Sequence, residues 1–172
     1  LGLFGFRCHL IDACDRPGGQ CAMLYADKPI YDVPGFPEIM GKELVERLLK
    51  QIERYKPVFY FNKIAVSITN DGKGVAVNSR DGDKFKARAV VIASGLGAFS
   101  GNGQVIRPDP LAELSLIKTG NMLAVSPETF RTSGPKVYAI GDACHYPGKL
   151  KLILSGFHEA ALMTQAMRRE LR

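Results

Sequence analysis

The most regular apolar pattern in the chain lies in the stretch GKELVERLLKQIERYKP, residues 41–57. Its apolar side chains recur every three or four residues, which is the spacing of one face of an α-helix. Pro57 cannot continue a helix, so we expect the helix to end before it. The predicted buried face carries Leu44, Val45, Leu48, Leu49, Ile52 and Tyr55.

Short runs rich in β-branched and aromatic residues follow this helix, at 58–61, 63–70, 74–80 and 85–94. Two dipeptides that favour tight hairpin turns, Asp71-Gly72 and Asp81-Gly82, fall between them. This pattern predicts a three-stranded meander that leads into a buried strand at Ala89–Ser94.

The other segments alternate between apolar runs and loops rich in Gly and Pro. A strand is predicted to end on Asp12, and one short helix is predicted after Gly19 in the Pro-rich loop that follows. Residues 95–110 form a Gly/Pro-rich junction, and two further strands are predicted at 122–125 and 136–140.

The last apolar pattern, LILSGFHEAALMTQAMRRELR, predicts a closing helix that begins near Ser155 or Gly156. We expect it to bury Phe157, Ala160, Met163 and Met167. The order of the elements predicts an α/β fold with a meander rather than a plain βαβ alternation.

Composition narrows the functional classes. With 172 residues, 46% of them hydrophobic, the chain fits one domain with a sizeable core. It has no apolar run of membrane-spanning length and no basic leader with a cleavage site at its start, so we expect a cytoplasmic protein. The four cysteines contain no CxxC pair, which indicates reduced thiols and no dithiol redox centre.

The net charge of +6 has two interpretations. Spread basic side chains could steer an acidic partner towards the protein, or they could simply form a solvated surface. A nucleic-acid partner is disfavoured, because the sequence has no helix-turn-helix, no Cys/His finger and no basic run interleaved with aromatic residues.

The stretch AIGDACHYPG, residues 139–148, carries the densest chemistry. Cys144-His145 could form a zinc site with Cys8-His9, but adjacent residues of an extended segment point apart, and structural zinc sites use spacers. The same geometry disfavours a Cys–His nucleophile pair. We therefore interpret the Cys-His pair as a bystander and Gly141-Asp142, at the end of an apolar strand, as the functional element.

Three other motifs bear on a nucleotide site. An acid at a strand end, as Asp12 is, holds ribose hydroxyls in dinucleotide folds, although any surface strand can end on Asp. GLGAFSG (95–101) is not a phosphate loop, because Pro108 and Pro110 prevent the helix that would have to follow it. DRPGGQ, which ends at Gln20, could bring backbone N–H groups and an amide against a planar heterocycle, or could be a plain turn.

Together these motifs resemble the thioredoxin-reductase-like ferredoxin/flavodoxin–NADP⁺ reductases. The resemblance rests on three strings that cover nearly the whole chain in the order of the family: LIDACDRPGGQCAMLYADKPIYDVPGFPEIMGKELVERL, VVIASGLGAF and VYAIGDACHYPGKLKLILSGFHEAA. It implies an FAD-binding, Rossmann-like domain of the glutathione-reductase type, with a parallel sheet and a β-meander. It also implies that NADPH is the electron donor, that ferredoxin or flavodoxin is the acceptor, and that the protein forms a homodimer.

The resemblance also implies residue roles around FAD. Asp12 would hold the adenosine ribose, and Gln20, after Gly19, would reach the ribityl and flavin region. Tyr25 would line the flavin. Two further roles belong to strands: Ala65 would meet the adenine through its backbone, and Phe99 would lie at a strand end beside the cofactor. Asp142 would accept a hydrogen bond from a ribityl hydroxyl, and no catalytic side chain or metal ligand is implied.

The chain departs from the family pattern in two places. The first strand with its GxGxxG turn should precede LGLFGF, and an NADPH domain should be inserted between GLGAFSG and VIRPDP. We therefore expect an FAD domain formed by residues 1–100 and 111–172, joined at a junction, 101–110, where that domain would stand. The alternatives are a non-catalytic domain derived from a flavoprotein and a flavin-dependent disulfide or quinone reductase.

Overall fold

The structure is a computed structural model that describes residues 1–70, 72, 74–95, 97–99, 105–107, 111 and 114–171, with 98–99 and 105–107 described by their backbone alone. The chain forms two compact units. Unit 1 comprises Leu1–Lys63 and Gly97–Pro108, and unit 2 comprises Ile64–Leu96 and Asp109–Arg172. Asp71 of the predicted hairpin turn and most of the predicted junction lie outside the described residues.

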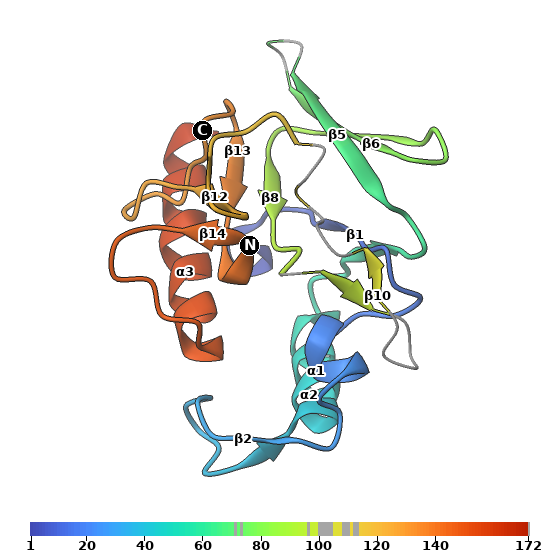
Figure 1. The fold of residues 1–172 in the computed structure, drawn as a ribbon, viewed down its shortest axis with the longest axis vertical. Helices are drawn as coiled ribbons and strands as arrows, with labels where there is room; N and C mark the ends of the chain where they lie inside the picture. Colours follow the sequence, from blue (N-terminus) through green and yellow to red (C-terminus); the bar gives the residue numbers. More distant parts are fainter. Residues whose placement is uncertain are drawn as a thin grey trace. The chain divides into compact units, whose positions relative to one another are not determined.

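Unit 1 is built around two neighbouring helices, α1 and α2 (Figure 1). Its strands pair two by two, with β1 and β4 parallel and the pairs β2–β3 and β9–β10 antiparallel. The elements are η1 (Gly2–Phe4), β1 (His9–Ile11), α1 (Gly19–Met23), β2 (Pro29–Ile30), β3 (Ile39–Met40), α2 (Gly41–Glu53), β4 (Val58–Tyr60), β9 (Ala98–Phe99) and β10 (Val105–Arg107).

The predicted amphipathic helix is confirmed as α2, which ends at Glu53, before Pro57. Of the predicted buried face, Leu44 is buried and Tyr55, beyond the last turn, is exposed. The other four residues are partly buried: Val45, Leu48, Leu49 and Ile52. The helix begins at Gly41, where a Cβ atom would collide with the carbonyl oxygen of Tyr25. Glycine therefore allows the start of α2 to pack directly against the backbone that follows α1.

Unit 2 contains the predicted meander, in the antiparallel order β5 (Ala65–Asn70), β6 (Val75–Ser79) and β7 (Lys84–Ala87). The strand predicted at Ala89–Ser94 is confirmed as β8 (Val90–Ile92), although only Ile92 of it is buried, and it pairs in parallel with β13 (Val137–Ala139). Its third sheet consists of β11 (Lys118–Thr119), β12 (Met122–Ala124) and β14 (Cys144–His145), followed in the chain by α3 (Ile153–Glu170). The α/β class with a meander is therefore confirmed.

Helix α3 begins earlier than predicted, and its predicted buried face is confirmed at Met163 and Met167 but wrong at Phe157. It begins at Ile153, before Ser155, and it buries Glu159, Met163, Thr164 and Met167. The predicted core residue Phe157 is 43% exposed, because it lies two positions from Glu159 and so on nearly the opposite face. Ala160 is only partly buried. The predicted buried face did not include Glu159.

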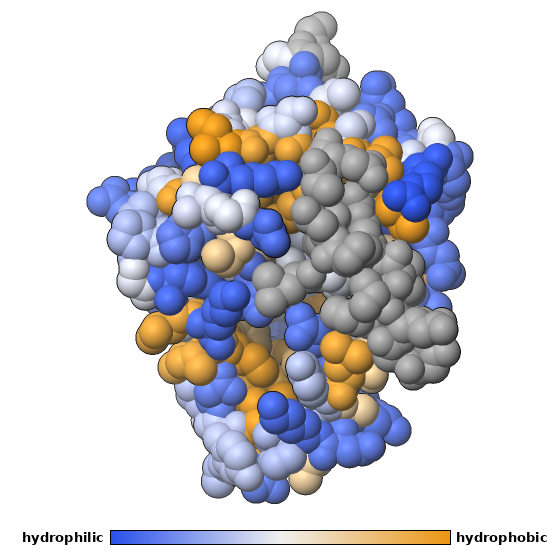
Figure 2. All heavy atoms as spheres, viewed as in Figure 1, coloured by the Kyte–Doolittle hydropathy of each residue, from blue (hydrophilic) through white to orange (hydrophobic). Residues whose placement is uncertain are grey.

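Apolar side chains lie at the surface around the start of α3 (Figure 2), the large ones being Leu150, Leu152, Leu154 and Phe157. No helix among the described residues is long and apolar enough to cross a membrane.

Candidate functional site

The turn at Gly141-Asp142 begins where the buried strand β13 ends. All three residues of β13 are buried, and Ile140 extends the pairing by donating its N–H to the Ile92 carbonyl at 3.0 Å. Gly141 then adopts a φ of 66°, a left-handed conformation that side-chain-bearing residues rarely take. The chain leaves the sheet at this residue and forms the short helix η2 (Gly141–Ala143).

The Asp142 carboxylate is a partly buried acceptor at this turn. Among the described residues, none donates a hydrogen bond to it. A Cβ atom on Gly141 would meet nothing within 4 Å, so the space beside the turn is open. An unsatisfied carboxylate next to open space is suited to a ligand hydroxyl group, and the turn therefore fits the ribityl role that the sequence predicts.

The buried carboxylate of Glu159, on α3, packs against the turn and supports it. Its Oε2 accepts a hydrogen bond from the Gly141 N–H at 2.6 Å, and its Oε1 accepts one from the Tyr146 hydroxyl at 3.0 Å. Oε1 also pairs with the Lys149 ammonium. The Glu159 side chain has no exposed surface and that of Lys149 is 5% exposed, so this is a buried ion pair.

Lys149 completes the support by donating to the Gly141 carbonyl at 2.9 Å. The Cys144 thiol lies among the same groups, 3.3 Å from the Gly141 oxygen and 3.7 Å from Glu159 Oε2. Burial and the charge of Glu159 raise the pKa of Cys144 to about 12, and burial and the hydrogen bond to Glu159 raise the pKa of Tyr146 to about 12. Both groups therefore remain protonated donors at neutral pH.

Cys144, interpreted as a bystander to the chemistry, is a fully buried part of this support. Its neighbour His145 belongs to the same short strand, β14, which pairs with β12. Within the described ranges, no group of three His, Cys, Asp or Glu side chains is arranged to hold a metal ion.

In unit 1, Asp12 follows β1 directly. Its N–H donates to Tyr60 O and its carbonyl accepts from the Lys63 N–H, both at 2.9 Å, so its backbone is fixed against the end of β4. Its Oδ1 accepts from the Cys14 N–H at 2.9 Å. Oδ2 keeps acceptor capacity, as a ribose-binding acid requires.

Gly18 and Gly19 turn the chain into α1 with φ angles of 115° and 51°. A Cβ on Gly18 would approach Ala22 and Val45 within 3 Å, which ties the turn closely to α2. The turn places Gln20 in the first turn of α1, partly buried.

The remaining predicted residues lie at element ends. In unit 1, Tyr25 follows α1 and is 41% exposed, and the centre of its ring lies 4.9 Å from the Lys28 ammonium. Phe99 ends β9, a strand adjacent to α1. Phe99 is described by its backbone alone. In unit 2, Ala65 begins β5 at a register irregularity that separates it from Ser67.

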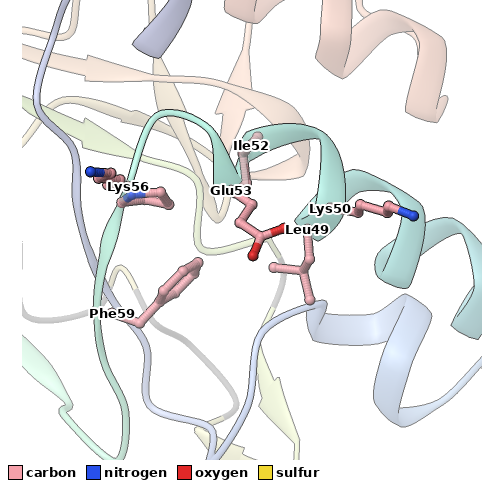
Figure 3. A pocket seen from close by; sticks show the side chains of 7 residues that line it. Leu49, Lys50, Ile52, Glu53, Lys56 and Phe59 are labelled. Carbon is pink, nitrogen blue, oxygen red and sulfur yellow. The ribbon is translucent and has the colours of Figure 1, made fainter.

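An open hollow of about 500 Å³ lies between α2 and β4 in unit 1 (Figure 3). Leu49, Ile52, Pro57 and Phe59 line it together with charged side chains, and Glu53 lies between Leu49 and Phe59. The described lining includes none of the residues assigned to the cofactor.

Sequence reasoning missed Lys149, Tyr146 and Glu159 as members of the site. One signal was available, namely a single acid between small and apolar residues in FHEAALM, because such an acid on the core side of a helix must be paired.

Comparisons with known proteins agree with this geometry. The sequence model of the flavin containing amine oxidoreductase family matches residues 35–126. A ferredoxin–NADP reductase of Mesorhizobium japonicum is 30% identical over 293 positions, which cover 98% of this chain and 85% of that protein. One of Wolbachia pipientis wMel is 41% identical over 102 residues, 59% of this chain and 30% of that protein.

Solved structures give the fold. The thioredoxin reductase of T. acidophilum superposes with a TM-score of 0.74 at 13% identity, covering 99% of this chain and 93% of that one. The predicted FAD-binding fold is thereby confirmed. The chain belongs to the flavin-containing oxidoreductases, and among them to the ferredoxin–NADP reductase family with a thioredoxin-reductase-like FAD-binding fold.

Proposed function

We propose that this protein transfers electrons from NADPH to ferredoxin or flavodoxin through a bound FAD, for which the Gly141-Asp142 turn of unit 2 is a binding element. The observation that carries the proposal is the Asp142 carboxylate, which has no hydrogen-bond donor among the described residues and stands beside open space on a turn with buried support. The relatives named ferredoxin–NADP reductase support the choice of electron partners.

The residues have separate binding roles in this proposal. Asp142 accepts a hydrogen bond from a ribityl hydroxyl, and Asp12 accepts from the adenosine ribose. Gln20 of the Gly19 turn donates its amide to the ribityl and flavin region, and Tyr25 offers an exposed ring to the flavin. Ala65 contributes its backbone to the adenine, and Phe99 lies beside the cofactor.

When bound, FAD supplies the hydride and single-electron chemistry, so the protein needs to bind, orient and shield rather than to provide a nucleophile. The cysteines agree with this division. All four are free thiols, two of them buried, and the sequence contains no CxxC pair.

The NADPH-binding part is proposed to stand between residues 101 and 105 in relatives. The alignment with the Mesorhizobium japonicum protein runs over 293 positions although this chain has 172 residues, so the aligned region of that protein contains positions without a counterpart here. The antiparallel pair β9–β10 flanks the proposed insertion point and would give such an insertion two adjacent ends.

The test is an FAD titration followed by flavin fluorescence, comparing the chain with Asp142→Ala and with Glu128→Ala, an exposed carboxylate of unit 2 as control. A hydrogen bond to a charged acceptor contributes about 1.5–3 kcal/mol, so Asp142→Ala should raise the Kd about ten- to a hundredfold, and the control should leave it unchanged. An Asp142→Ala protein that binds FAD normally would refute the assigned role. A chain that binds no FAD would favour the non-catalytic alternative. NADPH-dependent reduction of ferredoxin and of flavodoxin by the flavin-loaded protein then tests the partners.

A further inference from the structure

The buried Lys149–Glu159 ion pair has no part in the binding roles assigned above. Removing two charges from water is unfavourable, and replacing such a pair by apolar side chains often leaves stability unchanged or raises it. Both side chains lie in unit 2 with almost no exposed surface, so the pair carries the full desolvation penalty. Stability alone therefore does not explain it, and a geometric role has to be considered.

The two charges hold the two backbone polar groups of one residue. Glu159 Oε2 accepts from the N–H of Gly141 at 2.6 Å, and Lys149 Nζ donates to the carbonyl of Gly141 at 2.9 Å. Gly141 is the residue whose left-handed conformation turns the chain, and the next residue is Asp142. The ion pair thus fixes the orientation of the peptide units on both sides of Gly141.

The segment YPGK, residues 146–149, forms a turn that positions the donors Tyr146 and Lys149. The N–H of Lys149 donates to the carbonyl of Tyr146 at 3.1 Å, Pro147 stands at the second position, and Gly148 has a φ of 80°. These are the features of a type II turn. The turn brings the Lys149 ammonium and the Tyr146 hydroxyl to the same carboxylate, Glu159 Oε1.

Helix α3 positions the acceptor, Glu159. Glu159 lies in its second turn, and Gly156, one turn earlier, faces η2, where a Cβ atom would make an ordinary van der Waals contact with the Gly141 Cα at 4.0 Å. Each oxygen of Glu159 already faces a donor: Oε2 faces Gly141, and Oε1 faces Lys149 and Tyr146. A glutamine at position 159 could accept hydrogen bonds only through its single oxygen, because its NH₂ group would face another donor.

We propose that Lys149 and Glu159 are positioning residues for the flavin, acting through Gly141 to hold the Asp142 carboxylate in its binding orientation. This inference rests on the proposed role of Asp142. Neither side chain touches the ligand in this proposal, so loss of the pair should weaken FAD binding only while Asp142 is present.

The decisive variant replaces both charges, Lys149→Met with Glu159→Met, and is compared with the single variants Lys149→Met and Glu159→Gln. FAD affinity is measured by fluorescence titration and folding by thermal unfolding without FAD. A matched control is Glu170→Gln, which removes another α3 carboxylate from an ion pair, the one with Arg131. We expect the double variant to unfold no earlier than the singles and still to raise the Kd at least about tenfold, with the control within about twofold.

A double-mutant cycle with Asp142→Ala separates this inference from the proposed function. In the Asp142→Ala background, adding Lys149→Met should change the Kd by less than about twofold, because the group that it positions is gone. Wild-type FAD affinity in the Lys149→Met/Glu159→Met variant, or full additivity in the cycle, would overturn the positioning role. An Asp142→Ala protein with normal affinity would instead overturn the proposed function on which it rests.

Discussion

Replacing Gly141 by Ala tests the turn at its most constrained residue. The left-handed conformation at a φ of 66° costs a non-glycine residue about 1–2 kcal/mol. A Cβ at this position meets no protein atom within 4 Å, so no steric collision within the described protein adds to that cost. For a protein of this size, such a loss lowers the melting temperature by about 2–8 °C.

Gly82→Ala provides the matched control. Gly82 lies in the hairpin between β6 and β7 of the same unit and has a φ of 93°, and a Cβ atom there would also meet nothing within 4 Å. The backbone penalty should therefore be of the same kind at both sites. We expect both variants to melt earlier by similar amounts, as measured by circular dichroism without FAD.

The FAD titration should separate the two variants. The open space beside Gly141 is the space that the proposed ligand uses, so a methyl group there should raise the Kd about tenfold or more, whereas Gly82→Ala should leave it within about twofold. If Gly141→Ala bound FAD as tightly as Gly82→Ala, the ligand would not approach this turn. If only Gly82→Ala lost stability, the left-handed conformation of Gly141 would not be required.

Two further predictions concern titratable groups in unit 2. The Arg131 guanidinium and the Tyr138 hydroxyl hold the pKa of Glu170 below its ordinary value of about 4.5. The ionised carboxylate therefore stabilises the fold above that pH, and this contribution is lost as the pH falls through the lowered pKa. In urea unfolding below about pH 4.5, the free energy of unfolding should fall more steeply with pH in the wild type than in Glu170→Gln. Burial raises the pKa of Cys144 from about 9 to about 12, so the stabilisation from keeping it protonated is present below pH 9 and is lost as the pH rises towards 12. Cys144→Ser should flatten this alkaline loss, and the native Cys144 thiol should resist a thiol reagent at pH 8 until urea unfolds the protein.

The elements that could be predicted from the sequence are those with a regular pattern of apolar positions or with clear turn residues at their ends. Helix α2 has a full apolar face, and the strands of the meander are separated by Asp-Gly turns, so periodicity identified both. The turn at Gly141-Asp142 was also predictable, because an apolar strand ended on Gly-Asp. Pairs of two-residue strands, such as β2–β3, could not be predicted, since they contain too few residues for any alternation to show.

The buried support of the turn was not predictable for a different reason. Charged residues such as Lys149 and Glu159 are normally placed in solvent, and only tertiary structure brings a loop lysine and a helix glutamate together across ten residues. The predicted buried face of α3 was correct at Met163 and Met167, but it included the exposed Phe157 and did not include the buried Glu159. The residue missing from the predicted core is therefore also a residue missing from the predicted site.

The buried charges at Lys149 and Glu159 suggest where functional residues should be sought in flavoprotein domains of this kind. Since the cofactor supplies the chemistry, a search for nucleophiles or acid–base pairs finds none, and attention goes to reactive-looking residues such as Cys144 and His145. The structure directs attention instead to Gly141, whose two backbone groups are held by opposite charges. In the proposed site, side chains that fix a backbone turn contribute because the turn presents Asp142, and they are recognised by their burial and by the donors and acceptors that they satisfy.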